Sequence, residues 1–296
     1  MQSNQTSVRR KCLLLTMLTF ALVLTFVQQA HAYTFTILNI GAQAFTQANG
    51  INESDEVVGT FIAVSGLLKG FRRDTKGAIA EFSVPDASAT SANGINNSGQ
   101  IVGFFVDASG HTRGFLRHTN GTFTTIDVPG AIQTQAFGIN ALGEIVGTFK
   151  DGSGFHGFKR DTKGDFAAIN GPGGFGNTEV HGINDSGEIA GSFTTQTDGQ
   201  RGFLLKPNGE LTPFKVPGLP TDAWGINTSG QIVGFVTVTA VGPPFLTQGF
   251  RRDKNGTVTF IPNADGLIAV LQGLGINASG KIVGLYTIST GFLATP

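Results

Sequence analysis

The sequence predicts an all-β protein, a six-bladed β-propeller with four antiparallel strands per blade and an N-terminal strand that completes the last blade. Three observations predict it: a six-fold repeat, turn signals that divide each repeat into short strands, and chain ends that complement each other. The tripeptide Gly-Ile-Asn recurs in steps of 44, 44, 44, 43 and 50 residues. A fixed period of this size is typical of ringed or stacked units. The six tripeptides begin at Gly50, Gly94, Gly138, Gly182, Gly225 and Gly275.

The repeat at residues 88–131 shows the four expected strands. They are 91–96, 100–105, 112–117 and 122–128, and each is rich in Ile, Val, Phe or Thr. Turns containing Gly99 and Gly121 separate the first strand from the second and the third from the fourth, and such glycines close tight hairpins. In the first repeat Asp55 stands at the glycine position, where Asp is tolerated better than most residues. Four strands in roughly 40–45 residues is the size of a propeller blade.

The two ends of the chain decide between a closed ring and an open stack. The last repeat stops after its third strand, Gly291–Ala294. An orphan segment, Phe35–Ala42, resembles the fourth strand and following turn of the second repeat, Phe123–Ala131. We therefore expect the orphan segment to pair with the last repeat, which would remove the exposed edges of an open stack.

Small residues are expected where the first strands of the repeats converge on the axis. The repeated Gly of Gly-Ile-Asn lies there, and the residue two places earlier is Ala, Val or Gly in every repeat. The Gly-Phe pair of each third strand is expected to fill the wider gaps between blades, where burying one Phe is worth roughly 1.5–3 kcal/mol. These phenylalanines are Phe71, Phe115, Phe158, Phe203, Phe250 and Phe292.

The first 32 residues have the pattern of a signal peptide. Arg9, Arg10 and Lys11 precede an apolar run, and Ala30-His31-Ala32 provides a small-x-small cleavage site. We expect residues 1–32 to be removed and residues 33–296 to form one propeller domain that is secreted or periplasmic, with no membrane association after cleavage. An uncleaved N-terminal anchor is the alternative. The single cysteine, Cys12, would leave with the signal, so the domain would contain no disulfide.

Charge argues against a nucleic-acid partner. Cleavage would remove three of the 20 basic residues and none of the 20 acidic ones, leaving a formal charge of −3. Nucleic-acid binding requires a basic surface. The sequence also lacks local spacings of His and carboxylate residues that indicate a metal site, so neither a metal nor a cofactor is expected.

The repeats resemble those of the HAF family of extracellular repeat proteins. The pattern G-I-N-x-x-G-x-I-V-G, followed by G-F and then V-P-G-A, carries the resemblance and covers nearly all of residues 33–296. The family is named for a His-Ala-Phe triplet, to which only His156-Gly157-Phe158 comes close here. The resemblance implies export and repetition, and it supplies no catalytic residues.

Two variable sets of residues precede the repeated glycines, three places and one place before them. If both sets share a pleat face, repeats four and five bring two carboxylates and two rings together near the channel mouth. Paired carboxylates beside an aromatic ring suit sugar binding or acid–base chemistry. Solvated polar residues with packed rings are the alternative interpretation. The predicted ligand-binding residues are Gln135, Glu179, His181, Asp222, Trp224 and Gln272.

These observations favour a protein without chemistry of its own, which binds an extracellular glycan or a cell-surface protein through variable loops. Two alternatives stay open. One is a polysaccharide hydrolase or lyase with Glu179, Asp222 and His181 as its catalytic candidates. The other is a structural repeat protein without a ligand.

Overall fold

The computed structural model describes residues 33–40, 45–172, 177–216, 218–238, 246–262, 271–287 and 289–296. They belong to one compact unit, Tyr33–Pro296. The predicted signal peptide, residues 1–32, lies outside the described residues. Every helix or strand assigned in the described ranges is a β-strand, which confirms the all-β class.

The strands follow the repeats along the chain. Repeat one contains β2 (Thr46–Ile51), β3 (Val57–Ile62), β4 (Leu68–Arg73) and β5 (Ile79–Phe82). Repeat two contains β6 (Ala89–Ile95), β7 (Ile101–Val106), β8 (Thr112–Arg117) and β9 (Phe123–Ile126). Repeat three contains β10 (Gln133–Ile139), β11 (Ile145–Asp151), β12 (Gly154–Arg160) and β13 (Phe166–Ile169). Repeat four contains β14 (Thr178–Ile183), β15 (Ile189–Thr195), β16 (Gly199–Leu205) and β17 (Leu211–Phe214). Repeat five contains β18 (Thr221–Ile226), β19 (Ile232–Thr237), β20 (Thr247–Arg252) and β21 (Val258–Phe260). Repeat six contains β22 (Leu271–Ile276), β23 (Ile282–Tyr286) and β24 (Thr290–Thr295), while β1 (Thr34–Leu38) precedes all the repeats.

The strands form five assigned sheets. Repeats three, four and five each make a four-stranded antiparallel sheet. A fourth sheet has the order β1-β24-β23-β22, so the N-terminal strand pairs with the last one. The fifth sheet has eight strands, in which the strands of repeats one and two are joined by a single parallel pair, Leu68 with Ala89.

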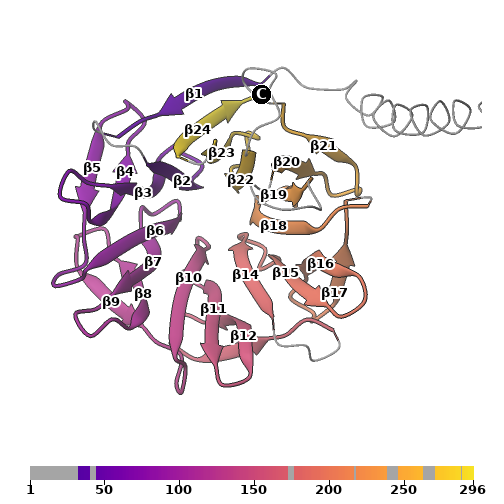
Figure 1. Ribbon diagram of the computed structural model, residues 1–296, viewed down its shortest axis with the longest axis horizontal. Helices are drawn as coiled ribbons and strands as arrows, with labels where there is room; N and C mark the ends of the chain where they lie inside the picture. The colour runs from indigo at the N-terminus through magenta and orange to yellow at the C-terminus, as the bar shows by residue number, and fades with distance from the viewer. Residues whose placement is uncertain are drawn as a thin grey trace, which may run out of the picture. The chain divides into compact units, whose positions relative to one another are not determined.

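The expected pairing of the chain ends is present. β1 runs antiparallel to β24, in a register that places Thr34 opposite Thr295 and Leu38 opposite Gly291. Figure 1 shows β1, in indigo, lying along the yellow β24. Leu38 is buried and packs in one core cluster with Val283 of β23 and Phe71 of β4. The N-terminal strand thus contributes both a sheet edge and core packing.

The first strand of each repeat lies innermost, around a common axis (Figure 1). These strands approach so closely that their glycines leave no room for a side chain. A Cβ added at Gly94 of β6 would lie 2.5 Å from the carbonyl oxygen of Phe137 in β10. The same relation links the last inner strand to the first, since a Cβ at Gly275 would lie 3.0 Å from the carbonyl oxygen of Asn49. The inner strands are β2, β6, β10, β14, β18 and β22.

The Asn of each Gly-Ile-Asn both closes a turn and joins neighbouring repeats. In repeat two, the Asn96 Oδ1 accepts hydrogen bonds from the backbone N–H groups of Ser98, at 3.2 Å, and Gln100, at 2.9 Å. Its Nδ2 donates to the backbone oxygen of Asn140 in the next repeat, at 3.2 Å. The six inter-repeat bonds, 3.0–3.4 Å long, form a closed circuit through Asn52, Asn96, Asn140, Asn184, Asn227 and Asn277.

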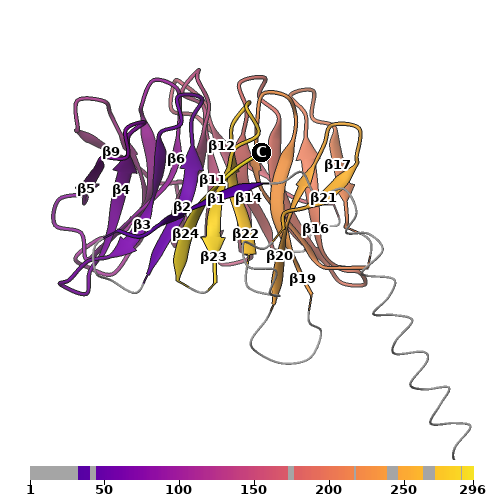
Figure 2. The same cartoon turned by 90° about the horizontal axis from the view of Figure 1, so that it is seen from above.

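Figure 2 shows the strands running between two faces. We call the face that carries the first-to-second and third-to-fourth strand turns the hairpin face. In its turns, Gly99 and Gly121 have φ values of 80° and 89°, and Asp55 reaches 65° as its position predicts. We call the opposite face the loop face. There the connections between repeats meet the second-to-third strand turns, as in the bridge between Asn177 and Phe155.

Packing between repeats follows the expected pattern. All six phenylalanines of the Gly-Phe pairs are completely buried. Phe115 of repeat two shares a cluster with Val58 of repeat one, and Phe158 of repeat three with Val102 of repeat two. Each phenylalanine therefore helps to hold two repeats together, in addition to packing within its own sheet.

The inner strands contain a feature that the sequence did not predict. The pairing register shifts between Ala92 and Gly94 in β6 and at the equivalent place in β2, β10, β14 and β22, while in β18 it shifts between Ala223 and Ile226. Such a shift is a β-bulge, in which one extra residue re-aims the neighbouring side chains. The extra residue is the one directly before the repeated glycine. The simple pleat alternation assumed for this stretch is therefore wrong.

We predict that Gly94→Ala destabilises the protein. The new Cβ would overlap a backbone carbonyl that cannot move away without separating two repeats, and overpacking of this kind costs roughly 1–3 kcal/mol. Gly152→Ala is the matched control, because its Cβ would meet no atom within 4 Å. Urea unfolding measures both variants. Equal midpoints for Gly94→Ala and Gly152→Ala would contradict the close approach of the inner strands.

We also predict that Asn140→Ala lowers the free energy of unfolding by about 2–4 kcal/mol, because it removes several hydrogen bonds of roughly 0.5–1.5 kcal/mol each. The Asn140 side chain bonds the N–H groups of Leu142 and Glu144, the Glu144 carboxylate and the Asn184 oxygen. Leu142→Ser, in the same turn and with its side chain largely exposed, serves as the control. An Asn140→Ala variant as stable as this control would refute a structural role for the circuit.

Candidate functional site

The axis of the inner strands encloses two small cavities separated by isoleucines. The cavity toward the loop face has a volume of about 80 Å³, and the one toward the hairpin face about 60 Å³. Both are lined by the isoleucine of every Gly-Ile-Asn, so these side chains form an apolar waist between them. The isoleucines are Ile51, Ile95, Ile139, Ile183, Ile226 and Ile276.

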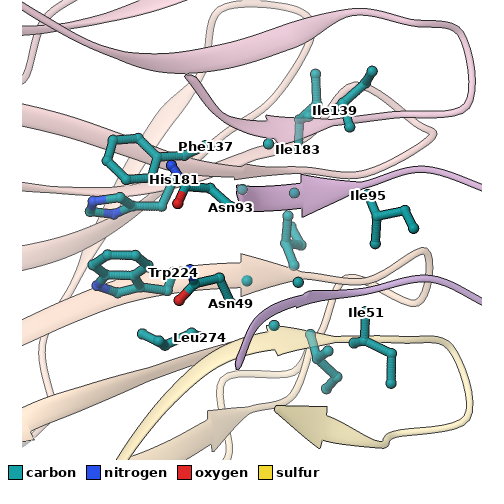
Figure 3. A pocket seen from close by; sticks show the side chains of 18 residues that line it. Asn49, Ile51, Asn93, Ile95, Phe137, Ile139, His181, Ile183, Trp224 and Leu274 are labelled. Carbon is teal, nitrogen blue, oxygen red and sulfur yellow. The ribbon is translucent and has the colours of Figure 1, made fainter. Parts of the chain in front are cut away.

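The loop-face cavity is polar on one side and aromatic on the other, as Figure 3 shows. The bulged residue of each inner strand lines it. Asn49 and Asn93 supply amides, whereas Phe137, His181 and Trp224 supply rings. The His181 and Trp224 rings stack in parallel, with centroids 3.9 Å apart, and Phe137 meets both edge-on. One face of Trp224 is therefore covered by a side chain of the protein.

His181 takes over a structural role that an amide plays elsewhere. The side chains of Asn49 and Asn93 donate to the backbone oxygen of Ala92 and of Ala136, each at 2.8 Å. His181 Nδ1 lies 3.1 Å from the equivalent oxygen, that of Ala223, and must carry a proton to bond it. Burial lowers the pKa of His181, so the ring is neutral near pH 7 and its Nε2 has a free lone pair.

Asp222 is a buried carboxylate that sits between two repeats. It comes from β18, and it accepts a 2.7 Å hydrogen bond from the Ser192 hydroxyl of β15. Burial raises the pKa of Asp222 to about 6, against the lowering effect of the hydrogen bonds from Ser192, Trp224 and Gln200. The Trp224 Nε1 is itself buried and has no hydrogen bond of regular geometry with a described residue. The Asp222 carboxyl group is thus held in place but poorly solvated.

Glu179 lines a separate pocket on the loop face, with a volume of about 220 Å³, which we call the Glu179 pocket. Its side chain is 43% exposed, and its carboxylate lies 3.9 Å from His181 Nε2. The pocket combines a carboxylate, amides, hydroxyls and two phenyl rings. Among the described residues that line it, none is Lys or Arg. The lining residues are Phe155, Asn177, Glu179, Ser192, Phe193, Thr194 and Gln200.

The structure divides the predicted site residues between different places. His181 and Trp224 line the axial cavity, Glu179 lines its own pocket, and Asp222 is buried behind Ser192. Gln135 on β10 and Gln272 on β22 are half-buried and line neither cavity. The β-bulge explains the division, because it turns the residue before each glycine toward the axis. The residues three places before each repeated glycine, such as Glu179 and Asp222, project into the spaces between repeats instead.

Among the described residues that line the Glu179 pocket, Glu179 alone was predicted as a site residue. Ser192 connects the Glu179 pocket to Asp222, while Gln200 and Phe155 line the pocket. Ser192 pairs across the sheet with Glu179, so strand register is the one sequence-level signal that would have found it. Gln200 and Phe155 lie at positions where the other repeats vary in length and composition.

The triplet nearest to His-Ala-Phe lies beside this pocket rather than in it. His156 Nδ1 is 2.7 Å from Asn170 Oδ1, and its Nε2 is 2.9 Å from the Ser153 hydroxyl. Arg113, the residue before the Gly-Phe pair of repeat two, bonds Asp127 in the equivalent place. In both repeats the side chain connects the third strand to the end of the fourth. We therefore assign His156 a structural role.

Two further tests apply to the described part of the chain. There, His, Cys, Asp and Glu side chains do not gather in groups of three or more that could hold a metal ion. Over the same residues, no helix has the length and hydropathy needed to cross a membrane.

We predict that Asp222→Asn flattens the dependence of stability on pH. The carboxyl ionises near its ordinary value of 3.8 when unfolded and near 6 when folded, so the wild-type protein loses stability as the pH rises between these values. The amide of the Asp222→Asn variant does not ionise and so avoids this loss in the free energy of unfolding. The loss amounts to about 3 kcal/mol when the pKa rises from 3.8 to about 6. Urea unfolding from about pH 4 to 7 measures it. If the free energy of unfolding changed with pH in the same way for the wild-type and Asp222→Asn proteins, the burial of an ionisable carboxyl group at position 222 would be contradicted.

Comparisons with known proteins identify the fold class. No family model and no curated protein matches the sequence. Among solved structures, virginiamycin B lyase from Staphylococcus aureus is 15% identical, with a TM-score of 0.52 over 90% of this chain and 100% of that chain. TolB from Acinetobacter baumannii is 12% identical, with a TM-score of 0.56 over 81% of this chain and 63% of that chain. A lectin from Aleuria aurantia is 12% identical, with a TM-score of 0.50 over 82% and 88%. At these identities the likeness shows the fold alone, and that fold is a β-propeller.

Proposed function

We propose that this chain is an exported six-bladed β-propeller that binds an extracellular glycan through the loop face, at the Glu179 pocket. The observation that carries the proposal is the composition of this pocket: a half-exposed carboxylate, amide and hydroxyl groups, and phenyl rings in one concave site. Sugars present many hydroxyl groups together with apolar ring faces, which such a lining complements.

The count of six blades rests on the inner strands. Six of them surround the axis, and six asparagines complete the hydrogen-bond circuit. We count the eight-stranded sheet as two blades, because a single residue pair, Leu68 with Ala89, joins its two halves. With β1 completing the sheet of β22, β23 and β24, every blade then has four strands.

Export and family membership are further parts of the proposal. The basic residues, apolar run and Ala30-His31-Ala32 of the first 32 residues support cleavage by a signal peptidase and a secreted or periplasmic domain. The G-I-N-x-x-G-x-I-V-G repeats support membership of the HAF family. A cell-surface protein would reach the same loop face, and it is the alternative partner to a glycan.

The lectin comparison supports a sugar ligand. The similar lectin is described in complex with Fucα1-6GlcNAc, which establishes that a ring of this kind can serve as a glycan-binding scaffold. The identity of 12% carries no residue of that site over to this chain. The choice of the Glu179 pocket therefore rests on its own chemistry.

A catalytic function is the second candidate, and one observation favours it. The pKa of Asp222, raised to about 6, suits a group that exchanges protons near neutral pH. A polysaccharide hydrolase or lyase would use it together with Glu179 and His181. The burial of Asp222 behind Ser192, and of His181 under Trp224, favours the binding function instead.

A glycan array, followed by titration calorimetry on the hits, tests the proposed function. We expect a glycan to bind and Glu179→Ala to weaken it by about tenfold or more, since a hydrogen bond to a charged group is worth roughly 1.5–3 kcal/mol. Gln135→Ala, at the equivalent place in repeat three, should leave affinity unchanged. An array without hits would refute glycan binding.

The same hits decide between binding and catalysis. Mass spectrometry of the bound glycan after prolonged incubation should recover it intact. If fragments form with the wild-type protein and disappear with the Glu179→Ala/Asp222→Ala double variant, the protein is an enzyme and the binding-only proposal fails.

A further inference from the structure

Among the described residues, Glu179 forms no salt bridge with a Lys or Arg side chain. In the described part of the chain, the one basic side chain near the Glu179 carboxylate is His181, whose Nε2 is 3.9 Å away. That ring is buried and neutral, and its protonated nitrogen, Nδ1, is directed at the Ala223 oxygen. The Glu179 carboxylate therefore lies at the wall of the pocket without a cationic partner among the described residues.

Two of the neighbouring cations, Arg201 and Lys215, are paired with one carboxylate. Arg201 follows Gln200 in β16 and forms a salt bridge with Asp198. Lys215 donates to the same residue, to its carboxylate at 3.1 Å and its backbone oxygen at 2.9 Å. Neither Arg201 nor Lys215 is among the described residues that line the pocket. A third cation, Lys150, lies with its Nζ 5.3 Å from the centre of the Phe155 ring, and among the described residues it forms no salt bridge with Glu179.

The hydrogen-bonding groups of the pocket also favour a donor as ligand. Ser192 gives its only hydroxyl hydrogen to Asp222, at 2.7 Å, so the oxygen offers lone pairs to the pocket. Gln200 Nε2 points at that oxygen, at 3.4 Å, which leaves Oε1, a pure acceptor, as the other end of the amide. Glu179 contributes two further acceptor oxygens. Asp222 lies behind Ser192 and does not itself line the pocket.

We propose that the Glu179 pocket binds the primary ammonium group of an amino sugar, such as a glucosamine unit of a deacetylated glycan. This inference rests on the proposed glycan-binding function and names its ligand class. An ammonium group has three donors and no acceptor, which matches the Glu179 carboxylate and the acceptor oxygens of Ser192 and Gln200. N-acetylation removes the charge and two of the donors, so the acetylated sugar should bind more weakly.

Titration calorimetry with matched oligosaccharides tests this inference. The ligands are tetramers of glucosamine and of N-acetylglucosamine, compared at about pH 6. We expect the glucosamine tetramer to bind at least about tenfold more tightly, the increment of a hydrogen bond to a charged group. The preference should shrink as NaCl is raised, because the pocket is partly exposed.

The variant Glu179→Gln isolates the charge. It introduces the residue that already stands at the equivalent positions 135 and 272, so the strand should accept it. It should abolish the tenfold preference for the glucosamine tetramer. Gln135→Glu is the control, since it adds a carboxylate to an inner strand away from the pocket and should not alter the preference.

The outcomes separate this inference from the proposed function. Equal affinity for both tetramers, or a preference that survives Glu179→Gln, overturns the ammonium site while glycan binding stands. The ammonium site is also overturned if neither tetramer binds but other glycans on the array do. Spermidine serves as a sugar-free cation, and if it binds as tightly as the glucosamine tetramer, the pocket recognises ammonium groups without the sugar and the assignment to amino sugars is wrong.

Discussion

The closed circuit of asparagine hydrogen bonds is the constraint on which the rest of the structure depends. Each of the six side chains closes the turn of its own repeat and holds the backbone of the next. The circuit is complete because Asn277 of the last repeat donates to Asn52 of the first, at 3.3 Å. That last bond requires the two ends of the array to meet, which the pairing of β1 with β24 secures. Closure therefore depends on side-chain amides near the axis and on one sheet farther out.

This scaffold leaves the residue before each repeated glycine free to vary. The bulge directs that residue toward the axis whatever its type, since Asn93 and His181 both bond the neighbouring inner strand. Its variation among the repeats therefore changes the lining of the cavity while the bulge is kept. The aromatic side of the cavity arises in this way, from Phe137, His181 and Trp224 on consecutive inner strands. The pocket beside Glu179 arises from a different source, the side chains that project between repeats.

Much of the fold could be predicted because its signals are local and repeated. The turn glycines located the strands within a few residues, and Asp55 adopts the left-handed conformation that its turn position requires. The complementarity of Phe35–Ala42 to the last repeat indicated the correct partner for β1. The fourth strand of repeat two is shorter than expected, 123–126 instead of 122–128, because the Val128 N–H turns away to bond Thr134.

The site was less predictable, because it depends on the β-bulges and on the packing between repeats, and the repeat pattern of the sequence indicates neither. A bulge adds one residue without any marker in composition, and it separated Glu179 and Asp222 from the rings expected beside them. The contact of Asp222 with Ser192 joins two repeats and depends on how closely they pack. The sequence could indicate that repeats four and five differ from the others, but not which side chains would share a pocket.

An engineered disulfide between the chain ends tests ring closure most directly. Thr36 lies opposite Leu293 in the register of β1 and β24, and facing residues of antiparallel strands are close enough for a disulfide. With Cys12→Ser, the pair Thr36→Cys and Leu293→Cys should form an intramolecular disulfide in the native protein, detected by mass spectrometry after proteolysis. Ile37→Cys with Leu293→Cys, offset by one residue, should not, because the two thiols would point to opposite faces of the sheet. Equal crosslinking of both pairs, or of neither, would contradict a closed ring.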